Sequence, residues 1–544
     1  MRQGLSPDLI ARVLGSAPKY TIAQLEQKFP QRNLPDNAMV TRVAPSPTGF
    51  MHLGTLYQMM IAKKFAVQSS GVFFLRIEDT DTKREVDGAG DVILKCAREF
   101  NLQPDEGPEQ GGSYGPYLQS ERRDIYHSVV AELLADGRAY PCFLNATEMD
   151  DIREKQKAAG FATGIYGEFA RDRNITNDEI IERMNRGEQP SIRLYSMGDK
   201  SQKIFFNDSV RGRLAFPEND EDIVLIKSND GLPTYHFAHL CDDHFMRTTL
   251  VQRGEEWLSS LNLHLQLFRM MKWDSPNYIH VATINKLDDE TGNSRKLSKR
   301  TDPEANTVKY LESGFPVESV LDYLYNIVSS GYEEEKSKKP DTNIWNYPLK
   351  IKKIPTSSAL FNMQKLEWWA REFIATLSVD ELVNRVTVWA NEYSTEWATR
   401  IGIKSDDLGP VVKPRDDKLG YLHAMLSIER DNPKRIRKDF VTWKQTLEEV
   451  AYFWDDLFVS AADFEFSKNA LGAFVQVFDI NDDKDTWWAK IVKIATDLGL
   501  KNGDVAMQLR VALTGRTNTP DLYSIIQVMG ADRVCNRIER VLDV

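Results

Sequence analysis

The feature that most constrains the fold is a strand–helix–strand pattern in residues 39–79. Residues 39–44 (MVTRVA) predict a buried strand, residues 55–70 (TLYQMMIAKKFAVQSS) a helix, and residues 72–79 (VFFLRIED) a second strand. Two strands joined through a helix run parallel, so the pattern predicts a βαβ unit in a parallel sheet. Ligands bind such sheets at the carboxyl ends of the strands. We therefore expect a site where the first strand turns into the helix.

The connecting segment, residues 42–54 (RVAPSPTGFMHLG), has the composition of a phosphate-binding turn. A helix N-terminus presents free N–H groups and a positive dipole end. Gly49 and Gly54 would let the backbone approach a ligand, and His52 could donate a hydrogen bond to a phosphate oxygen. A Pro–Gly turn with a surface histidine explains this segment equally well when it is taken alone.

A basic stretch, residues 295–300 (RKLSKR), is a second candidate for phosphate binding. Lys296 and Lys299 flank the small Ser298, and together they could clamp a pyrophosphate while negative charge develops on it. Basic stretches of this length are common. On its own, a solvated basic loop would be the favoured interpretation.

Two further stretches carry residues suited to an amino-acid substrate. Glu78, at the strand end in RIEDTD, could hold an ammonium group. The segment PTYHFAHLCDDHFM, followed by VQRGEEW, places Tyr235, His239 and Arg253 near the second half of the sheet, in a region expected to contain strands and loops. The histidines of this segment match no zinc-site spacing, so no metal site is predicted.

The organisation of the chain is read from changes in these patterns. After the first βαβ unit a different rhythm of short strands and one amphipathic helix indicates an inserted domain, and the last part of the chain is helical. Residues 332–343 are expected to form a charged, solvated connector. The predicted divisions are an N-terminal extension (1–38), the first half of a Rossmann-like catalytic domain (39–110), the insert (111–215), the second catalytic half (216–301), a helical region (302–345) and a second helical region (346–544).

Composition excludes several classes of protein. A length of 544 residues requires several domains, and no apolar run is long enough to span a bilayer or to form a signal peptide, so a cytoplasmic location is expected. The net charge of −11 argues against a simple nucleic-acid coat protein but permits RNA binding through a local basic groove. The four cysteines are scattered and form no CxxC pair, so neither a disulfide framework nor zinc is expected.

Taken together, the stretches resemble the class I aminoacyl-tRNA synthetases. HLGT is similar to their first signature and KLSKR to their lysine-rich second signature. RVAPSPTGFMHLG, RIEDTD, PTYHFA, RGEEWLSS and the C-terminal LTGRTNTPDL resemble the bacterial-type glutamyl-tRNA synthetases. The likeness runs from about residue 39 to the end of the chain. It implies an α/β fold in which a Rossmann-like parallel-sheet domain carries an inserted acceptor-binding domain and is followed by an all-helical, anticodon-binding region.

The resemblance also implies a reaction and its residues. ATP and Mg²⁺ would activate L-glutamate as glutamyl-adenylate with release of pyrophosphate, and the 3′-terminal adenosine of tRNA(Glu) would then accept the glutamyl group. The implied catalytic residues are His52, Lys296 and Lys299, and Gly54 and Ser298 join them in binding ATP. The residues implied to bind glutamate are Arg42, Ala44, Ser46, Glu78, Tyr235, His239 and Arg253.

Two positions depart from the family pattern. His239 stands where relatives commonly have Asn, and Thr55 takes the last place of the first signature. A monomer that contacts no membrane is expected. Whether the enzyme also glutamylates tRNA(Gln) stays open.

Other functions agree less well with the sequence. A glutaminyl-tRNA synthetase usually has a β-barrel C-terminal region, which disagrees with the helical pattern here. A small-molecule nucleotidyltransferase would not need the long helical region. An inactive RNA-binding relative would not need to keep Arg42, His52, Lys296 and Lys299.

Overall fold

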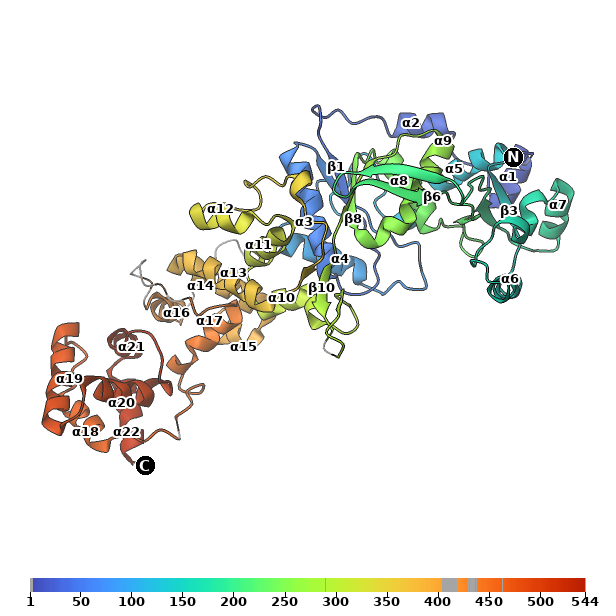
Figure 1. Cartoon of the computed structure of the whole chain (residues 1–544). Coiled ribbons are helices and arrows are strands. Elements are labelled where there is room, and N and C mark those ends of the chain that lie inside the picture. Colours follow the sequence, from blue (N-terminus) through green and yellow to red (C-terminus); the bar gives the residue numbers. More distant parts are fainter. Residues whose placement is uncertain are drawn as a thin grey trace. The chain divides into compact units, whose positions relative to one another are not determined.

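The computed structural model describes residues 3–288, 290–403, 418–428, 430, 436, 438–461 and 463–543. The chain forms two compact units (Figure 1). The N-terminal unit comprises Met1–Val308 and Leu324–Phe361, and the C-terminal unit comprises Lys309–Tyr323 and Asn362–Val544. Each unit has its own hydrophobic core.

A four-stranded parallel sheet lies at the centre of the N-terminal unit. Its order is β2 (Val72–Leu75), β1 (Val40–Val43), β8 (Leu250–Gly254) and β9 (Asn277–Val281), and every neighbouring pair is parallel. The predicted βαβ unit is therefore confirmed as β1, α3 (Leu53–Gln68) and β2. The pairing of β1 with β8 joins two parts of the chain that are far apart in sequence, which confirms the predicted α/β class.

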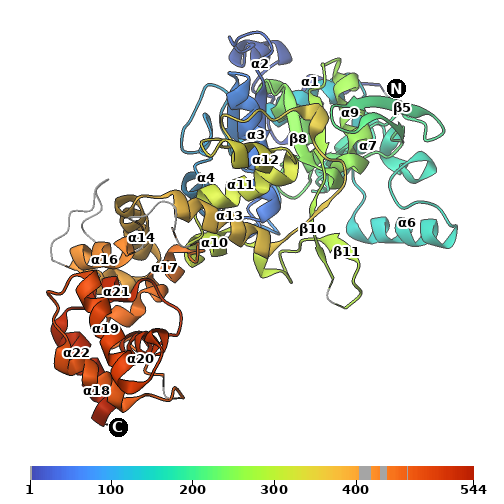
Figure 2. The ribbon, with the colours of Figure 1, turned by 60° about the vertical axis from the view of Figure 1, so that its left-hand side comes forward.

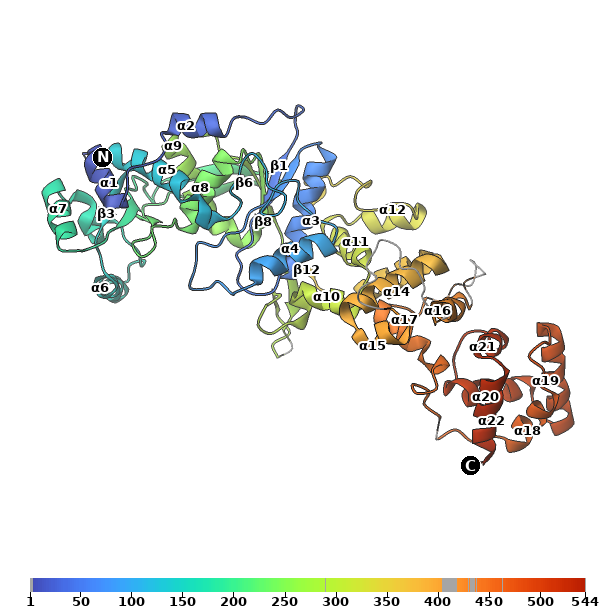
Figure 3. The ribbon, with the colours of Figure 1, turned by 180° about the vertical axis from the view of Figure 1, so that it is seen from behind.

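Helices cover both faces of this sheet. On one face the Thr41 hydroxyl donates to the Ala62 carbonyl of α3 at 2.8 Å. On the other face α9 (Leu261–Met271) packs Leu261 and Leu265 against the β8 residue Val251. Figures 1 and 3 show α3 on one side of β8, with α8 (Tyr235–Phe245) and α9 on the other. The sheet is buried on both faces, as its apolar strands require.

The helix α8 differs from the sequence-based expectation of strands and loops around residues 223–260. Its buried residues Phe237, Cys241 and Phe245 are four positions apart, which is a helical period. Histidines and aspartates lie between them, and most are themselves buried, so the amphipathic pattern is obscured in the sequence.

The charged connector also contains a helix, α12 (Tyr332–Lys338). Its glutamates pair with lysines one turn later: Glu334 with Lys338 at 2.6 Å, and Glu335 with Lys339 at 2.7 Å. Pairs at this spacing stabilise a helix that has little apolar surface.

The segment between β2 and β8 contains a second, antiparallel sheet and a hairpin. The sheet has the order β3 (Ala139–Cys142), β4 (Ser191–Leu194), β7 (Val224–Ile226), and the hairpin consists of β5 (Lys203–Asp208) and β6 (Gly212–Pro217). The other helices of this segment are α4 (Ala89–Glu99), α5 (Arg123–Ala135), α6 (Ala146–Ala158) and α7 (Asn177–Asn185).

After β9 the chain forms a small mixed sheet that carries the basic stretch. Its order is β11 (Ser294–Lys296), β10 (Ile284–Leu287), β12 (Ala359–Leu360). Helices α10 (Thr307–Ser313) and α11 (Val317–Val328) follow the basic stretch in the chain.

The N-terminal segment packs onto the core of its unit. Helices α1 (Pro7–Leu14) and α2 (Ile22–Lys28) contribute Leu9 and Leu25 to the same apolar cluster as Phe245 of α8. Glu26 of α2 lies 2.7 Å from His244 Nε2 and 2.5 Å from Arg247 Nη2. This segment therefore braces the C-terminal end of α8.

The C-terminal unit is helical, as predicted. Figure 2 shows α18, α19, α20 and α22 gathered into one bundle. The helix α21 is capped by Asp521, whose side chain accepts from the Ser524 N–H. Besides parts of α10 and α11, the described helices of this unit are α13 (Met363–Thr376), α14 (Val379–Tyr393), α15 (Thr395–Arg400), α16 (Lys418–Ser427), α17 (Trp443–Glu449), α18 (Lys468–Val477), α19 (Lys484–Leu498), α20 (Asn502–Thr514), α21 (Leu522–Met529) and α22 (Ala531–Asp543).

Among the described residues of both units, no helix combines the length and the apolar character needed to cross a membrane.

Candidate active site

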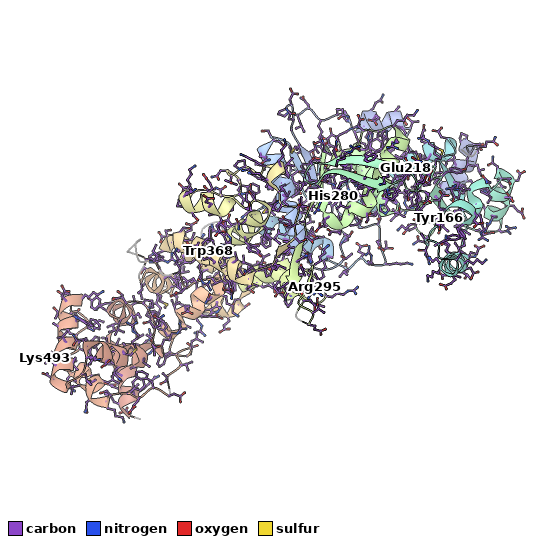
Figure 4. All side chains as sticks on the ribbon, viewed as in Figure 1. Tyr166, Glu218, His280, Arg295, Trp368 and Lys493 are labelled. Carbon is purple, nitrogen blue, oxygen red and sulfur yellow. The ribbon has the colours of Figure 1, made fainter. Side chains whose placement is uncertain are left out.

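The candidate site lies at the carboxyl edge of the parallel sheet. Each of the four strands places a polar side chain there: Arg42 in β1, Arg76 directly after β2, Arg253 in β8 and His280 in β9. Figure 4 labels His280 within this region. Parallel strands end at one edge, so polar residues from four distant segments meet.

A buried ion network occupies the β1–β2 side of this edge. Asp243 of α8 accepts hydrogen bonds from Arg42 Nε and Nη2, both at 3.2 Å, and from Arg76 Nη1 at 3.2 Å. Arg76 also donates to Glu78 at 3.0 Å. Burial alone would raise the pKa of Asp243, but Arg42 and Arg76 hold that pKa well below its ordinary value. Charges buried without partners would be costly, and here each arginine has an acidic partner.

The neighbouring carboxylate, Asp242, accepts hydrogen bonds from a second group of buried side chains. It accepts from Arg122 Nε at 2.6 Å and from Gln119 at 2.8 Å, and Tyr126 donates to it at 3.0 Å. Sequence reasoning missed Arg76 and both aspartates. The available signal was the pair of acids in the otherwise apolar segment FAHLCDDHF, where charged residues in a buried helix need basic partners.

His239 uses both ring nitrogens within the protein. Its Nδ1 lies 2.7 Å from Asp243 and its Nε2 lies 2.9 Å from the Tyr278 hydroxyl. Burial lowers the pKa of His239 to about 4, so the ring is neutral, with Nδ1 donating to Asp243. The predicted substrate residue His239 therefore lies in the site but supports Asp243 and Tyr278 instead of offering a free donor.

Arg253 and Tyr235 form the β8–β9 side of the site. Arg253 donates from Nε to His280 Nε2 at 2.9 Å and from Nη1 to His264 Nδ1 at 3.1 Å. Its Nη2 is buried and makes no hydrogen bond within the part of the chain that the structure describes. The Tyr235 ring lies 4.6 Å from the Trp257 ring. Burial raises the pKa of Tyr235, while the charge of Arg253 partly opposes that rise, as expected for close neighbours.

Sequence reasoning missed His264 and His280. His264 lies among leucines in LNLHLQLF, and a lone histidine on an apolar helix is read first as a core residue. For His280 the only signal was the alternation in NYIHV, which puts Tyr278 and His280 on the same face of β9.

Ala44 and Ser46 lie at the mouth of this site, in the loop after β1. The Pro45 carbonyl between them accepts from the Glu78 backbone N–H at 3.0 Å. Ser46 is exposed and Ala44 is half-buried. The loop therefore runs beside Glu78, with Ser46 one residue from the hydrogen-bonded Pro45.

His52 caps the helix that follows this loop. Its Nδ1 accepts from the Gly54 N–H at 2.8 Å, at the N-terminus of α3. A β-carbon on Gly54 would lie 2.9 Å from the same Nδ1, so glycine is needed for the ring to fold back over the helix end. The other nitrogen, Nε2, lies 3.1 Å from the Leu297 carbonyl oxygen.

The contact between His52 and Leu297 brings the basic stretch to the helix N-terminus. The Lys299 ammonium lies 5.4 Å from the centre of the Phe50 ring, and burial lowers the pKa of Lys299. Lys296 forms an ion pair with Glu256. The Ser298 N–H donates to Asp302 at 2.7 Å, and Asp302 pairs with Arg295 at 2.6 Å. The five predicted ATP-binding residues are thus gathered around one helix end.

The arrangement offers two adjoining receptors. One is a buried set of guanidinium groups that can receive carboxylates, and the other is a helix N-terminus with two lysines, which can receive phosphates. No cluster of three or more His, Cys, Asp or Glu side chains suited to a metal occurs among the described residues.

Comparison with known proteins gives two family matches. Residues 38–368 match the family described as tRNA synthetases class I (E and Q), catalytic domain, and residues 434–542 match an anticodon binding domain.

Curated relatives include a glutamate–tRNA ligase of Clostridium perfringens, 39% identical over 98% of each chain, and one of Acetivibrio thermocellus, 41% identical over 94% of this chain and 95% of that one. A solved glutamate tRNA ligase from Elizabethkingia meningosepticum, in complex with its amino acid, superposes with a TM-score of 0.75 at 26% identity, covering 93% of this chain and all of that one.

Proposed function

Because the chain belongs to the glutamate–tRNA ligases of the class I tRNA synthetase family, we propose that it activates L-glutamate with ATP and transfers the glutamyl group to tRNA(Glu). In the first step an oxygen of the α-carboxylate attacks the α-phosphorus of ATP, and the bond to pyrophosphate breaks. In the second step a terminal ribose hydroxyl of the tRNA attacks the activated carbonyl, and AMP leaves. Both steps depend on positioning and on charge stabilisation.

The observation that carries this proposal is the buried Arg253 with its unpartnered Nη2. A guanidinium group at 5% exposure, with two donors already committed, still has N–H groups for a carboxylate. We assign the side-chain carboxylate of glutamate to Arg253, with Tyr235 beside it. Glutamine would leave the positive charge unmatched, which disfavours it.

We assign the remaining contacts to glutamate mainly to residues of the buried ion network. Arg42 is held by Asp243 through Nε and Nη2, and its position at the end of β1 suits an interaction with a substrate carboxylate. Burial raises the pKa of Glu78, so an incoming ammonium group would stabilise its charged form. We therefore assign the α-amino group to Glu78 and Ser46.

The nucleotide is assigned to the end of α3. His52, Gly54, Lys296, Ser298 and Lys299 surround this helix terminus, whose N–H groups favour anions. Lys296 must exchange Glu256 for phosphate when ATP binds. Mg²⁺ would be held mainly by the ATP phosphates, because it commonly keeps waters and few protein ligands.

The test is glutamylation of purified tRNA(Glu) and tRNA(Gln) transcripts, side by side, with ATP, Mg²⁺ and glutamate. Charging of tRNA(Glu) is the expected result, and charging of both would identify a non-discriminating enzyme. A folded protein that charges neither, including native modified tRNA, contradicts the proposal. An anticodon-binding role for the C-terminal unit predicts that anticodon changes weaken charging.

A further inference from the structure

Arg253 is surrounded by imidazoles instead of carboxylates. In the register of the sheet Arg253 lies directly opposite His280, and the Arg253 Nε donates to His280 Nε2 at 2.9 Å. From the other side α9 supplies His264, whose Nδ1 accepts from Arg253 Nη1 at 3.1 Å. Among the described residues no carboxylate lies within ion-pair distance of Arg253. The nearest acid in this hydrogen-bond chain, Asp208, is reached only through the His280 ring.

The hydrogen bonds determine the form of both rings. An arginine can only donate, so His280 Nε2 and His264 Nδ1 must both be unprotonated. The remaining nitrogens then donate outward: His280 Nδ1 to Asp208 at 2.7 Å, and His264 Nε2 to His236 Nδ1 at 3.0 Å. Burial lowers the pKa of each ring, which agrees with two neutral imidazoles. Both rings therefore accept from Arg253 without cancelling its charge.

The neighbouring arginines differ from Arg253 because they pair with a carboxylate. Arg42 and Arg76 lie at the same sheet edge, and both pair with Asp243. Their positive charge is matched inside the protein. A buried cation without an anionic partner is unfavourable, and replacing the two histidines by acids would have removed that cost. Arg253 instead keeps its charge, and its buried Nη2 keeps an unused donor.

We propose that His264 and His280 are positioning residues for substrate selectivity. They hold the guanidinium of Arg253 in place through neutral acceptors, so that its net positive charge and its Nη2 are left for the side-chain carboxylate of glutamate. This inference rests on the proposed function. A carboxylate in either position would pair with Arg253 and compete with glutamate for it. Glutamine, whose side chain is neutral, would then bind better relative to glutamate.

The test compares His264→Asn with His264→Asp. The asparagine oxygen can take the place of Nδ1 as a neutral acceptor, and the aspartate differs from it by one negative charge at almost the same size. KM for glutamate is measured in tRNA(Glu) charging at saturating ATP, together with activity toward glutamine. We expect His264→Asn to stay within about threefold of the parent protein, and His264→Asp to raise KM for glutamate about 30-fold or more. KM for ATP should change in neither variant, and the preference for glutamate over glutamine should fall only with Asp.

Equal values for Asn and Asp would overturn the inference, because a merely structural histidine would not register the added charge. If His264→Asp does not fold, as judged by thermal unfolding, His264→Leu takes its place. Leucine removes the acceptor without adding a charge, so it should raise KM for glutamate about tenfold while Asn does not. Equal effects of Leu and Asn would again overturn the inference. Failure of the parent protein to charge tRNA(Glu) would instead count against the proposed function.

Discussion

The imidazole of His52 joins the two segments assigned to ATP, because its Nε2 lies 3.1 Å from the carbonyl oxygen of Leu297. Its Nδ1 accepts from Gly54, so the proton is on Nε2 and is donated to Leu297. A phosphate oxygen can accept this proton only by replacing the Leu297 carbonyl. If ATP binds at His52 as proposed, we therefore expect the basic stretch to move away from His52.

Gly54→Ala should weaken ATP binding. The added β-carbon would meet His52 Nδ1 at 2.9 Å and push the ring off the helix end. We expect KM for ATP to rise about tenfold, with a smaller change in KM for glutamate. Gly90→Ala in α4 is the matched control, because nothing lies within 4 Å of its β-carbon. That control should keep full activity and stabilise the fold by about 0.5–1 kcal/mol. Unchanged ATP kinetics in Gly54→Ala would argue against the role of His52.

Arg253→Gln should abolish selection for glutamate. The change keeps a polar side chain but removes the buried positive charge. We expect kcat/KM for glutamate to fall about 100-fold or more. The control is Arg269→Gln, an exposed arginine of α9, which should leave the kinetics unchanged. If Arg253→Gln charged tRNA(Glu) at the parent rate, the carboxylate assignment would be wrong.

His239 should not titrate during catalysis at neutral pH. Its pKa is lowered to about 4 by burial, so the folded protein keeps the ring neutral from pH 6 to 8. The unfolded chain takes up the proton near the ordinary pKa of about 6.5, and stability should therefore decline as pH falls from there toward 4. The pH profiles of kcat/KM for the parent and for His239→Asn should run parallel between pH 6 and 8. A step near pH 6.5 that vanishes in His239→Asn would contradict this.

Glu26→Gln should loosen the brace between the N-terminal segment and α8. Burial tends to raise the pKa of Glu26, but hydrogen bonds from His244 and Arg247 outweigh it and lower that pKa. Because the carboxylate pKa is lower in the folded state, Glu26 stabilises the fold at pH values above its ordinary, unfolded pKa. This stabilisation is lost as the pH falls through the pKa of the folded state.

We expect Glu26→Gln to cost about 1 kcal/mol of unfolding free energy at pH 7, a modest figure because the Glu26 side chain is 38% exposed. The difference from the parent should shrink below about pH 4.5. Denaturant unfolding at pH 7 and pH 4 measures it. Glu334→Gln, in an exposed pair of α12, is the control and should cost less. A difference that grew on acidification would exclude the proposed ion pair between Glu26 and Arg247.

Local patterns were sufficient to predict the parallel sheet and the helical C-terminal unit. The strand–helix–strand order of residues 39–79 allows few topologies, and it places the turn that we assign to phosphate directly after a strand. Local patterns failed where buried polar residues obscured the helical spacing of the apolar residues. In α8, aspartates and histidines lie between the apolar residues. They can be buried there because their partners come from β1, from Arg76 directly after β2, and from β9.

The sequence by itself determined the candidate side chains. They are Arg42, Glu78, Tyr235 and Arg253, proposed for an amino acid, and His52, Lys296 and Lys299, proposed for phosphates. Only the tertiary structure decided how each is held. The pairing of β8 with β9 sets His280 opposite Arg253, and α9 brings His264 to the same guanidinium group, whereas Arg42 meets Asp243. The physical reason is that the neighbours of a buried charged group decide whether its charge is neutralised within the protein. Those neighbours come from distant segments that meet only when the sheet forms.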